Sequence, residues 1–216
     1  MPVLALSGGL DSTTLLATYL EKTNTDIVPV FFCYGSKHNA WEEAAARKIA
    51  AHYNLPLHIV DMQPVFASVQ SALLCHDPRQ VPKENYAQSS MSQTLVPGRN
   101  LVFAAVLASL AESRGIPTVA LATHAGDHHL YPDCRPSFND ALNHTLREST
   151  DGAVQLETPF STIDKAGIVA LGLQLNVPFA LTRSCYQNSE KSCGECGTCR
   201  ERIEAFARNG VVDPAA

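Results

Sequence analysis

The stretch Val3-Leu4-Ala5-Leu6-Ser7-Gly8-Gly9-Leu10-Asp11-Ser12-Thr13 joins an apolar run to a glycine pair and then to a hydroxyl-rich segment. Apolar residues resume over 15–20, so the order predicts a strand, a tight turn and the start of a helix. Neither glycine has a side chain that would keep a ligand away from the backbone N–H groups, and the helix presents its positive end to the same place. The stretch therefore predicts a phosphate-binding loop.

The loop lacks the Gly-Lys-Ser/Thr sequence of loops that bind and transfer a γ-phosphate. Its Ser-Gly-Gly-x-Asp-Ser pattern resembles the signature of the PP-loop ATP pyrophosphatases. The resemblance implies that ATP is bound through its pyrophosphate and that AMP is transferred to a carboxylate or carbonyl oxygen. The competing interpretation is an ordinary strand-to-helix turn in which Asp11 or Ser12 caps the helix.

Strand and helix patterns alternate along the 216 residues, of which 45% are hydrophobic and 17% charged. This order predicts an α/β fold, an open parallel sheet with helices on both faces. We expect an α/β domain over 1–181 and a C-terminal module over 182–216. The long polar connection 63–96 indicates a functional loop or lid. Expected strands or short extended segments are 3–6, 27–32, 57–60, 119–122 and 153–157, and expected helices are 13–21, 38–54, 100–113, 137–147, 165–173 and 200–208.

Charge and hydropathy limit the class of protein. The net charge of −5 argues against a nucleic-acid partner and favours small substrates. No apolar run approaches the roughly 20 residues that cross a bilayer, so no membrane is expected. The first residues already form a core strand, which predicts that there is no signal peptide. We expect a cytoplasmic protein.

Four of the seven cysteines lie close together near the C-terminus. In a reducing compartment thiols bind metal more often than they form disulfides. Four thiolates with no open position are typical of structural zinc, and an iron–sulfur cluster is the alternative. The expected ligands are Cys185, Cys193, Cys196 and Cys199. Acidic and basic residues balance between 185 and 208, which argues against a nucleic-acid-binding zinc knuckle.

Three further polar loops are expected at the carboxyl ends of the strands, where open α/β sheets bind ligands. They span 34–38, 96–100 and 124–135. Each residue has a simple alternative role: Asn100 as a helix cap, Lys37 as a solvated charge, and Asp133 with Arg135 as a surface pair. Three such loops beside a phosphate loop nevertheless favour a binding site.

These motifs together resemble the 7-cyano-7-deazaguanine (preQ0) synthase family over nearly the whole chain. The segments that carry the resemblance are 7–14 (SGGLDSTT), Tyr34-Gly35 with His38, 96–100 (VPGRN), 131–135 (YPDCR), Thr158-Pro159 with Asp164-Lys165, and 184–186 before the cysteine triplet. The chain departs from the family pattern at Ser36 and Leu130, where many members have Gln and Gly. Residues 124–129, which lead into the YPDCR segment, also differ from the common family form because they are rich in histidine.

The resemblance implies that ATP, Mg²⁺ and ammonia convert 7-carboxy-7-deazaguanine to its nitrile through an adenylated carboxylate and an adenylated amide. It also implies a homodimer. No stretch is left for a glutaminase, so free ammonia or a separate partner should supply nitrogen. Asp133 is the candidate for reading the guanine-like edge, and Tyr131 or Phe138 for stacking on the ring. The implied catalytic residues are Ser7, Asp11, Ser12, Arg99 and Lys165; those for ATP are Leu6, Ser7, Gly8, Gly9, Leu10, Asp11, Ser12, Thr13, Arg99 and Asn100; those for the substrate are Lys37, His38, Tyr131, Asp133 and Arg135.

Three other functions remain open at this level. A PP-loop tRNA sulfurtransferase would need a persulfide on Cys33 or Cys134. A related synthase could attach the activated deazaguanine to another acceptor, because only the nucleophile would differ. A zinc module that binds nucleotide without turning it over is the non-enzymatic alternative.

Overall fold

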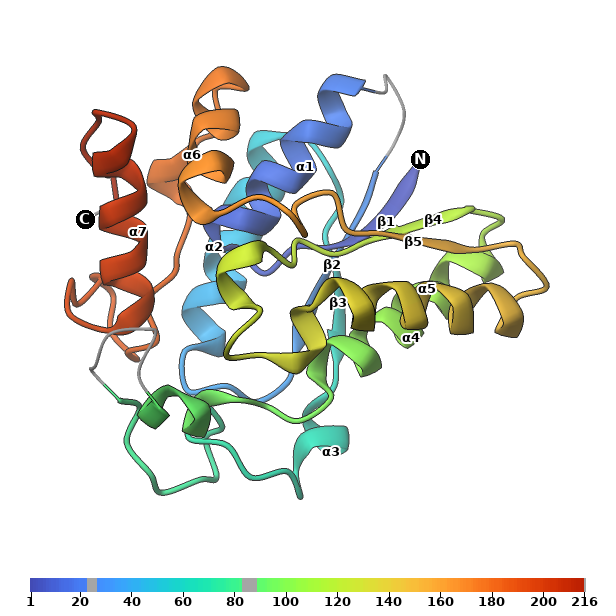
Figure 1. Ribbon diagram of the computed structural model, residues 1–216, viewed down its shortest axis with the longest axis horizontal. Coiled ribbons are helices and arrows are strands. Elements are labelled where there is room, and N and C mark those ends of the chain that lie inside the picture. Colours follow the sequence, from blue (N-terminus) through green and yellow to red (C-terminus); the bar gives the residue numbers. More distant parts are fainter. Residues whose placement is uncertain (23–26, 83–88, 216) are drawn as a thin grey trace.

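The computed structural model describes residues 1–22, 27–82 and 89–215. Within them a parallel sheet of five strands has the order β3-β2-β1-β4-β5 (Figure 1). The predicted α/β fold with an open parallel sheet is confirmed. The strands are β1 (Pro2–Ala5), β2 (Val28–Cys33), β3 (His58–Asp61), β4 (Thr118–Ala120) and β5 (Gln155–Glu157).

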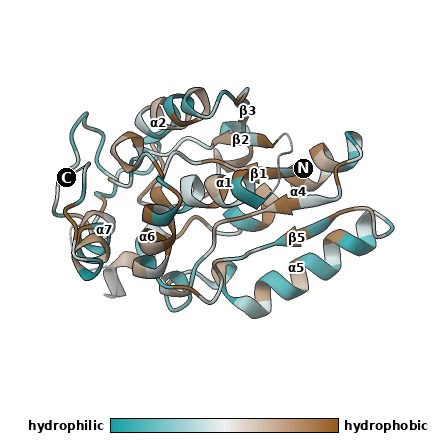
Figure 2. Ribbon diagram, turned by 90° about the horizontal axis from the view of Figure 1, so that it is seen from above, coloured by the Kyte–Doolittle hydropathy of each residue, from teal (hydrophilic) through white to brown (hydrophobic). Residues whose placement is uncertain are grey.

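Helices cover both faces of the sheet, as Figure 1 shows. Successive residues of β1 point to opposite faces: Val3 packs with residues of α4 and α5, and Leu4 with residues of α1, α2, α6 and α7. Seen from above, much of α5 is hydrophilic, in keeping with its few buried residues (Figure 2). The helices are α1 (Leu10–Lys22), α2 (Asn39–His52), α3 (Gln63–Phe66), α4 (Arg99–Ser113), α5 (Pro136–Ser149), α6 (Lys165–Gln174) and α7 (Gly197–Arg208).

The strand order places a crevice at the carboxyl end of β1. From β1 the chain moves to β2 and β3 on one side, and then crosses to β4 on the other side. The connections after β1 and β4 therefore separate at this point. Ligands of open α/β sheets bind at such a reversal of strand order.

Two helices begin three residues earlier than the sequence predicts. Helix α1 starts at Leu10 rather than 13, because the Thr13 N–H already donates to the Gly9 carbonyl (3.1 Å). Helix α7 starts at Gly197 rather than 200, with the Arg200 N–H donating to the Cys196 carbonyl (3.0 Å). Cys199 therefore lies in the first turn of a helix and not in a loop.

Parts of the connection after β3 pack on the core. Leu73, Leu74 and Val81 are buried in the same cluster as α4. Part of the predicted lid, residues 83–88, lies outside the described residues.

The expectation that no apolar run reaches membrane-spanning length was wrong. The segment Met91–Ser113 has 23 residues and contains an 18-residue window with a mean hydropathy of 1.5, enough to cross a membrane by length and composition. It contains α4, whose residues Phe103, Ala104 and Leu107 are buried against the sheet. A buried core helix passes the same test, so the segment is weak evidence for a membrane.

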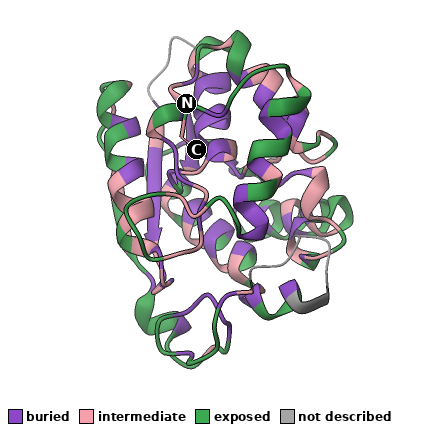
Figure 3. Cartoon of the chain, turned by 90° about the vertical axis from the view of Figure 1, so that its left-hand side faces the viewer, coloured by how far each residue is buried: buried purple, intermediate pink, exposed green. Residues whose placement is uncertain are grey.

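The C-terminal segment packs on the body through α7. Phe206 lies edge-on to Phe179, with 5.1 Å between ring centroids. The buried Arg202 donates to both carboxylate oxygens of Asp213 (2.7 and 2.9 Å) and to the Phe179 carbonyl (3.0 Å). Figure 3 views this side of the molecule, where exposed loops surround the inward-facing, buried parts of the helices. The division at residue 181 stays a prediction.

Candidate active site and metal site

A pocket of about 220 Å³ opens at the carboxyl ends of β1, β2 and β4. Its floor is made by residues that end these strands, such as Leu6, Phe32 and Leu121. Its walls come from the loop after β1, the start of α2, the start of α4, the segment after β4 and the loop around Cys185. Of the predicted site residues it is lined by Leu6, Ser7, Gly9, Asp11, Ser12, His38, Arg99, Asn100, Tyr131 and Lys165.

The loop Ser7-Gly8-Gly9 is held open by its own hydroxyl groups. The Ser12 hydroxyl, 5% exposed, accepts from the Ser7 N–H (3.2 Å) and lies 3.0 Å from the Ser7 Oγ. The Thr13 hydroxyl donates to the Gly9 carbonyl (2.7 Å). These bonds leave Ser7 exposed at the positive end of α1, where an anion is stabilised by the helix dipole.

Gly8 is the point where this loop touches α2. Its φ is +79°, and a Cβ there would lie 2.5 Å from the Glu42 carbonyl oxygen and 2.8 Å from the Ala46 nitrogen. The Gly8 carbonyl accepts from the Arg183 N–H (2.8 Å). Gly8 therefore fixes the loop between α2 and the segment that leads to Cys185.

One lysine and several acids form a charged cluster beside the loop. Lys165 Nζ lies 3.0 Å from Asp11 Oδ2 and 3.1 Å from Glu201 Oε2. Burial by itself would raise the pKa of Asp11, but the charge of Lys165 and the nearby His124 hold it below its usual value. Burial opposes the charge of Lys165 as well, yet Asp11 and Glu201 raise its pKa. Both groups are therefore charged at neutral pH.

The segments VPGRN and YPDCR are bonded to each other. Asp133 Oδ2 accepts from the Asn100 N–H (3.1 Å), and Asn100 Nδ2 donates to the Asp133 carbonyl (3.0 Å) and to Cys134 Sγ (3.3 Å). This junction places Arg99 at the pocket, with its guanidinium over the Tyr34 ring, 5.7 Å from the centroid. Burial disfavours the charge of Arg99, but Tyr34, Tyr186 and Asp133 raise its pKa well above the usual value. Arg99 is a partly buried, permanent positive charge.

Several predicted residues lie outside the pocket lining. Lys37 Nζ donates to the Arg79 carbonyl, and Arg135 Nε donates to the His128 carbonyl (2.8 Å). One carboxylate oxygen of Asp133 accepts from the start of α4, and its contact with a substrate edge stays a prediction. Phe138, in α5, is partly buried and packs against the core cluster on that side of the sheet. The predicted residues that do not line the pocket are Gly8, Leu10, Thr13, Lys37, Asp133 and Arg135.

Other pocket residues were not predicted. Tyr34 and Phe103 give an aromatic wall, with 5.7 Å between their ring centroids. Burial raises the pKa of the Tyr34 hydroxyl to about 12, so this wall stays neutral. The amphipathic pattern of α2 gives no sign that Glu42 faces the pocket. Tyr186 reaches the pocket because the loop around Cys185 folds back toward it. Also in the lining are Asp127, Arg183, Ser184 and Thr198.

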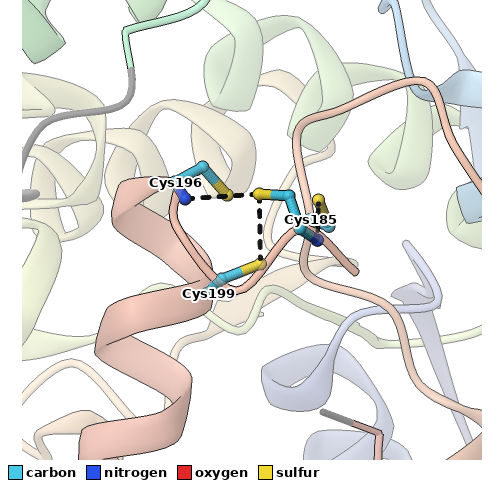
Figure 4. Close-up of side chains that lie close together, drawn as sticks. Cys185, Cys196 and Cys199 are labelled. Carbon is cyan, nitrogen blue, oxygen red and sulfur yellow. Dashed lines mark hydrogen bonds between the residues drawn. The ribbon is translucent and has the colours of Figure 1, made fainter. Parts of the chain in front are cut away.

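The four predicted cysteine ligands converge. Their sulfur atoms all lie within 4.8 Å of one another. Figure 4 shows Cys196 and Cys199, at the start of α7, facing Cys185 from the preceding loop. Backbone N–H groups of Gln187 and Cys193 donate to Cys185 Sγ (3.4 Å each). Four cysteine sulfurs grouped this closely form a candidate metal site.

The metal site and the pocket share residues. Ser184 and Tyr186 flank Cys185 in the sequence, Thr198 precedes Cys199, and all three line the pocket. The Thr198 hydroxyl donates to the Ser184 carbonyl (2.7 Å). A metal ion held by these cysteines would therefore fix one wall of the pocket.

Sequence comparison identifies the relatives of this chain. The family described as "Queuosine biosynthesis protein QueC" matches residues 1–210. The 7-cyano-7-deazaguanine synthase of Caldicellulosiruptor bescii is 41% identical over 212 residues, covering 98% of this chain and 95% of the relative. That of Methanoregula boonei is also 41% identical, covering 98% of this chain and 96% of the relative.

Solved structures resemble the fold at low identity. An NMN synthetase from Francisella tularensis has a TM-score of 0.55 at 15% identity, covering 97% of this chain and 76% of that one. The U34-tRNA thiolase NcsA from Methanococcus maripaludis, solved with its [4Fe-4S] cluster, has a TM-score of 0.53 at 13% identity, covering 96% and 65%. The sequence relatives, the PP-loop-type fold and the pocket at the glycine loop agree: this chain belongs to the queuosine biosynthesis protein QueC family of 7-cyano-7-deazaguanine synthases.

Proposed function

We propose that the chain converts 7-carboxy-7-deazaguanine, ammonia and ATP to 7-cyano-7-deazaguanine, AMP and pyrophosphate. The observation that carries the proposal is the Ser-Gly-Gly loop opening onto the same pocket as Arg99 and Lys165. The pocket thus offers a place for the phosphates of ATP and two cations for anionic oxygens. The activity for which the relatives are named supplies the identity of the product.

A carboxylate oxygen is a poor leaving group, so the reaction must first convert it to an AMP ester. The Gly9 N–H and the hydroxyls of Ser7 and Ser12 would hold the departing pyrophosphate at the start of α1. Arg99 would neutralise the substrate carboxylate or the α-phosphate. Ammonia then displaces AMP to give an amide. A second ATP activates the amide oxygen in the same place, and loss of AMP leaves the nitrile.

Asp11 also fits a Mg²⁺ ion. Its Oδ1 atom is buried and has no hydrogen-bond partner among the described residues, while Asp127 lines the same pocket. Carboxylate oxygens are the usual protein ligands of Mg²⁺, and the ion would neutralise charge on the phosphates of ATP. Lys165 keeps Asp11 ionised for this role.

The spacing of the cysteine sulfurs supports zinc. A tetrahedral ion with Zn–S bonds of about 2.3 Å places its sulfurs about 3.8 Å apart. Cys193 Sγ and Cys199 Sγ lie 4.0 Å apart, and no pair exceeds 4.8 Å. A four-iron cluster would have to fit its metal and sulfide atoms between these sulfurs, so we propose a single Zn²⁺ with a structural role.

Sulfur transfer to tRNA is disfavoured by the state of the candidate cysteines. A persulfide carrier needs an accessible thiolate of low pKa. Cys134 is buried, and burial raises the pKa of its thiol. Burial likewise raises the pKa of Cys33. Attachment of the activated base to another acceptor remains the second candidate, because it would use the same adenylate.

Mass spectrometry of the reaction product tests the proposal. Purified protein with ATP, Mg²⁺, ammonium and the 7-carboxy base should give the nitrile, with two AMP formed per nitrile. Ser12→Ala should lower AMP formation at least 100-fold while zinc content is retained, because Ser12 orders the loop. Formation of ADP, or turnover by Ser12→Ala at the normal rate, would contradict the assignment of the loop. We further propose a cytoplasmic homodimer, to be checked by light scattering.

A further inference from the structure

The proposed reaction removes protons from nitrogen, and the residues assigned so far hold anions. Ammonium must become ammonia before it attacks the acyl adenylate, and the adenylated amide must lose its N–H protons to become a nitrile. A base within reach of the reacting nitrogen is therefore needed. This requirement rests on the proposed function.

His38 and Glu42 line the pocket one helical turn apart at the start of α2. His38 is 1% exposed, and its Nε2 lies 3.4 Å from Glu42 Oε1. A carboxylate can only accept a hydrogen bond, so it favours the imidazole form with the proton on Nε2. The lone pair is then on Nδ1, which is buried and has no hydrogen-bond partner in the described part of the chain. An unsatisfied buried nitrogen is costly, and a ligand N–H would satisfy it.

Two other parts of the fold position this pair. Tyr186, next to a cysteine ligand, packs on the His38 ring with 5.1 Å between centroids. Gly8 allows the phosphate loop to touch the backbone of Glu42. The pair is therefore fixed relative to the loop at which pyrophosphate and AMP would lie.

Other basic residues at the pocket are already engaged. His124 Nδ1 accepts from the Gly126 N–H (3.1 Å), so its lone pair is occupied and its Nε2 faces Asp127 at 3.4 Å. Lys165 is paired with Asp11 and Glu201. Arginine cannot act as a base at neutral pH.

We propose that His38 is the general base of the nitrogen-transfer steps, acting through Nδ1, and that Glu42 positions it. Ammonium gives one proton to Nδ1, and the freed electron pair forms the C–N bond. The C–O bond to AMP breaks with its electrons leaving on the phosphate oxygen, and the second proton lost from nitrogen passes to water. In the second half the adenylated amide loses one N–H proton to Nδ1 and the other to water while its C–O bond breaks, which leaves the nitrile and AMP.

A comparison of partial reactions tests this role. In single turnovers with the 7-carboxy base, His38→Ala should release pyrophosphate within about threefold of the wild-type rate, because adenylation requires no nitrogen base. Its amide and nitrile formation should fall at least 100-fold. Hydroxylamine, which is largely uncharged at neutral pH, should restore product formation, as the hydroxamate, to within about threefold of wild type. Glu42→Gln should also lower amide and nitrile formation, by less than His38→Ala does, while pyrophosphate release stays near the wild-type rate.

His52→Ala is the matched control, since His52 is an exposed histidine at the other end of α2. It should behave as wild type in both partial reactions. If His38→Ala makes nitrile normally, loses pyrophosphate release in parallel, or only raises the KM of the 7-carboxy base, His38 is not the base. His38→Asn, with zinc content and Tm measured alongside, separates a failure to fold from a failure of chemistry. If wild type forms neither amide nor nitrile, the proposed function itself fails.

Discussion

At the scale of single residues, several polar groups of the predicted site are held by contacts within the protein. One carboxylate oxygen of Asp133, the residue predicted to read a base edge, accepts a hydrogen bond from the start of α4. Lys37 has the charge to bind phosphate but contacts a carbonyl group. Gly8, which does not line the pocket, decides how closely two of its walls approach.

Gly8→Ala should be much more damaging than an ordinary glycine replacement. The new Cβ would lie 2.5 Å from the backbone oxygen of Glu42, which cannot move without α2. The positive φ adds about 1 kcal/mol of strain. We expect stability to fall by at least about 2 kcal/mol and AMP formation to fall at least tenfold.

Gly210→Ala provides the control for that substitution. Gly210 has a similar φ of +70°, but nothing lies within 4 Å of its Cβ position. The free energy of unfolding of Gly210→Ala, measured by urea denaturation, should be about 1 kcal/mol below that of wild type, because only backbone strain is added. Equal losses for the two variants would show that the contact with α2 is unimportant.

At the scale of elements, the helix starts bring functional groups to the pocket. Helix α1 follows the phosphate loop directly, and His38 is the N-cap of α2. Helix α4 begins with Arg99 and α6 with Lys165. Lys165 is placed by a well-formed cap: Asp164 Oδ1 accepts from the Gly167 N–H (2.8 Å). The exposed ion pair between Asp164 and Arg208 (2.9 Å) adds little to folding stability.

Asp164→Ala should destabilise the protein by about 1 kcal/mol at pH 7, the usual cost of a lost cap. The hydrogen bond from Gly167 holds the pKa of Asp164 below its usual 3.8. A lowered folded-state pKa gives stability that is present above the usual value and lost as pH falls through the folded value. The difference in free energy of unfolding between wild type and Asp164→Ala, measured with urea, should therefore shrink below about pH 4. Asp164→Asn keeps a hydrogen-bond acceptor but not the ion pair. At pH 7 it should lose less than half of the unfolding free energy that Asp164→Ala loses.

At the scale of the whole molecule, the C-terminal segment completes the pocket that the N-terminal loop begins. Arg183, Ser184 and Tyr186 reach the pocket from the entry to the cysteine site, and Arg183 also holds the Gly8 carbonyl. Zinc should therefore affect activity as well as stability.

Cys196→Ser should reduce zinc from one ion per chain to a small fraction, measured by elemental analysis. A structural zinc contributes directly to folding free energy. We expect Tm to fall by roughly 10 °C, since each kcal/mol corresponds to roughly 2–4 °C in a chain of this size. Nitrile formation should fall with the zinc content.

Cys75→Ser tests whether the effect is specific to the cluster. Cys75 is exposed and lies outside the four-sulfur group. It should retain full zinc content and Tm. A zinc-free Cys196→Ser with normal Tm and nitrile formation would exclude a structural role for the metal.

The local features of the protein could be predicted from its amino-acid order. The spacing of apolar residues predicted the order of strands and helices, and the glycine pair predicted the turn after β1. The spacing of the cysteines pointed to the candidate metal ligands. Each of these features depends on residues close together along the chain. Family motifs in the sequence also pointed to Arg99, Lys165 and His38.

Which side chains share the pocket could be learned only from the folded chain. Whether Asp133 faces a ligand or the start of α4 depends on a contact across 33 residues. The approach of Tyr186 to His38 depends on segments nearly 150 residues apart, which only the packed fold brings together. Such contacts are set by how helices pack on the sheet, and no local pattern of residues encodes them.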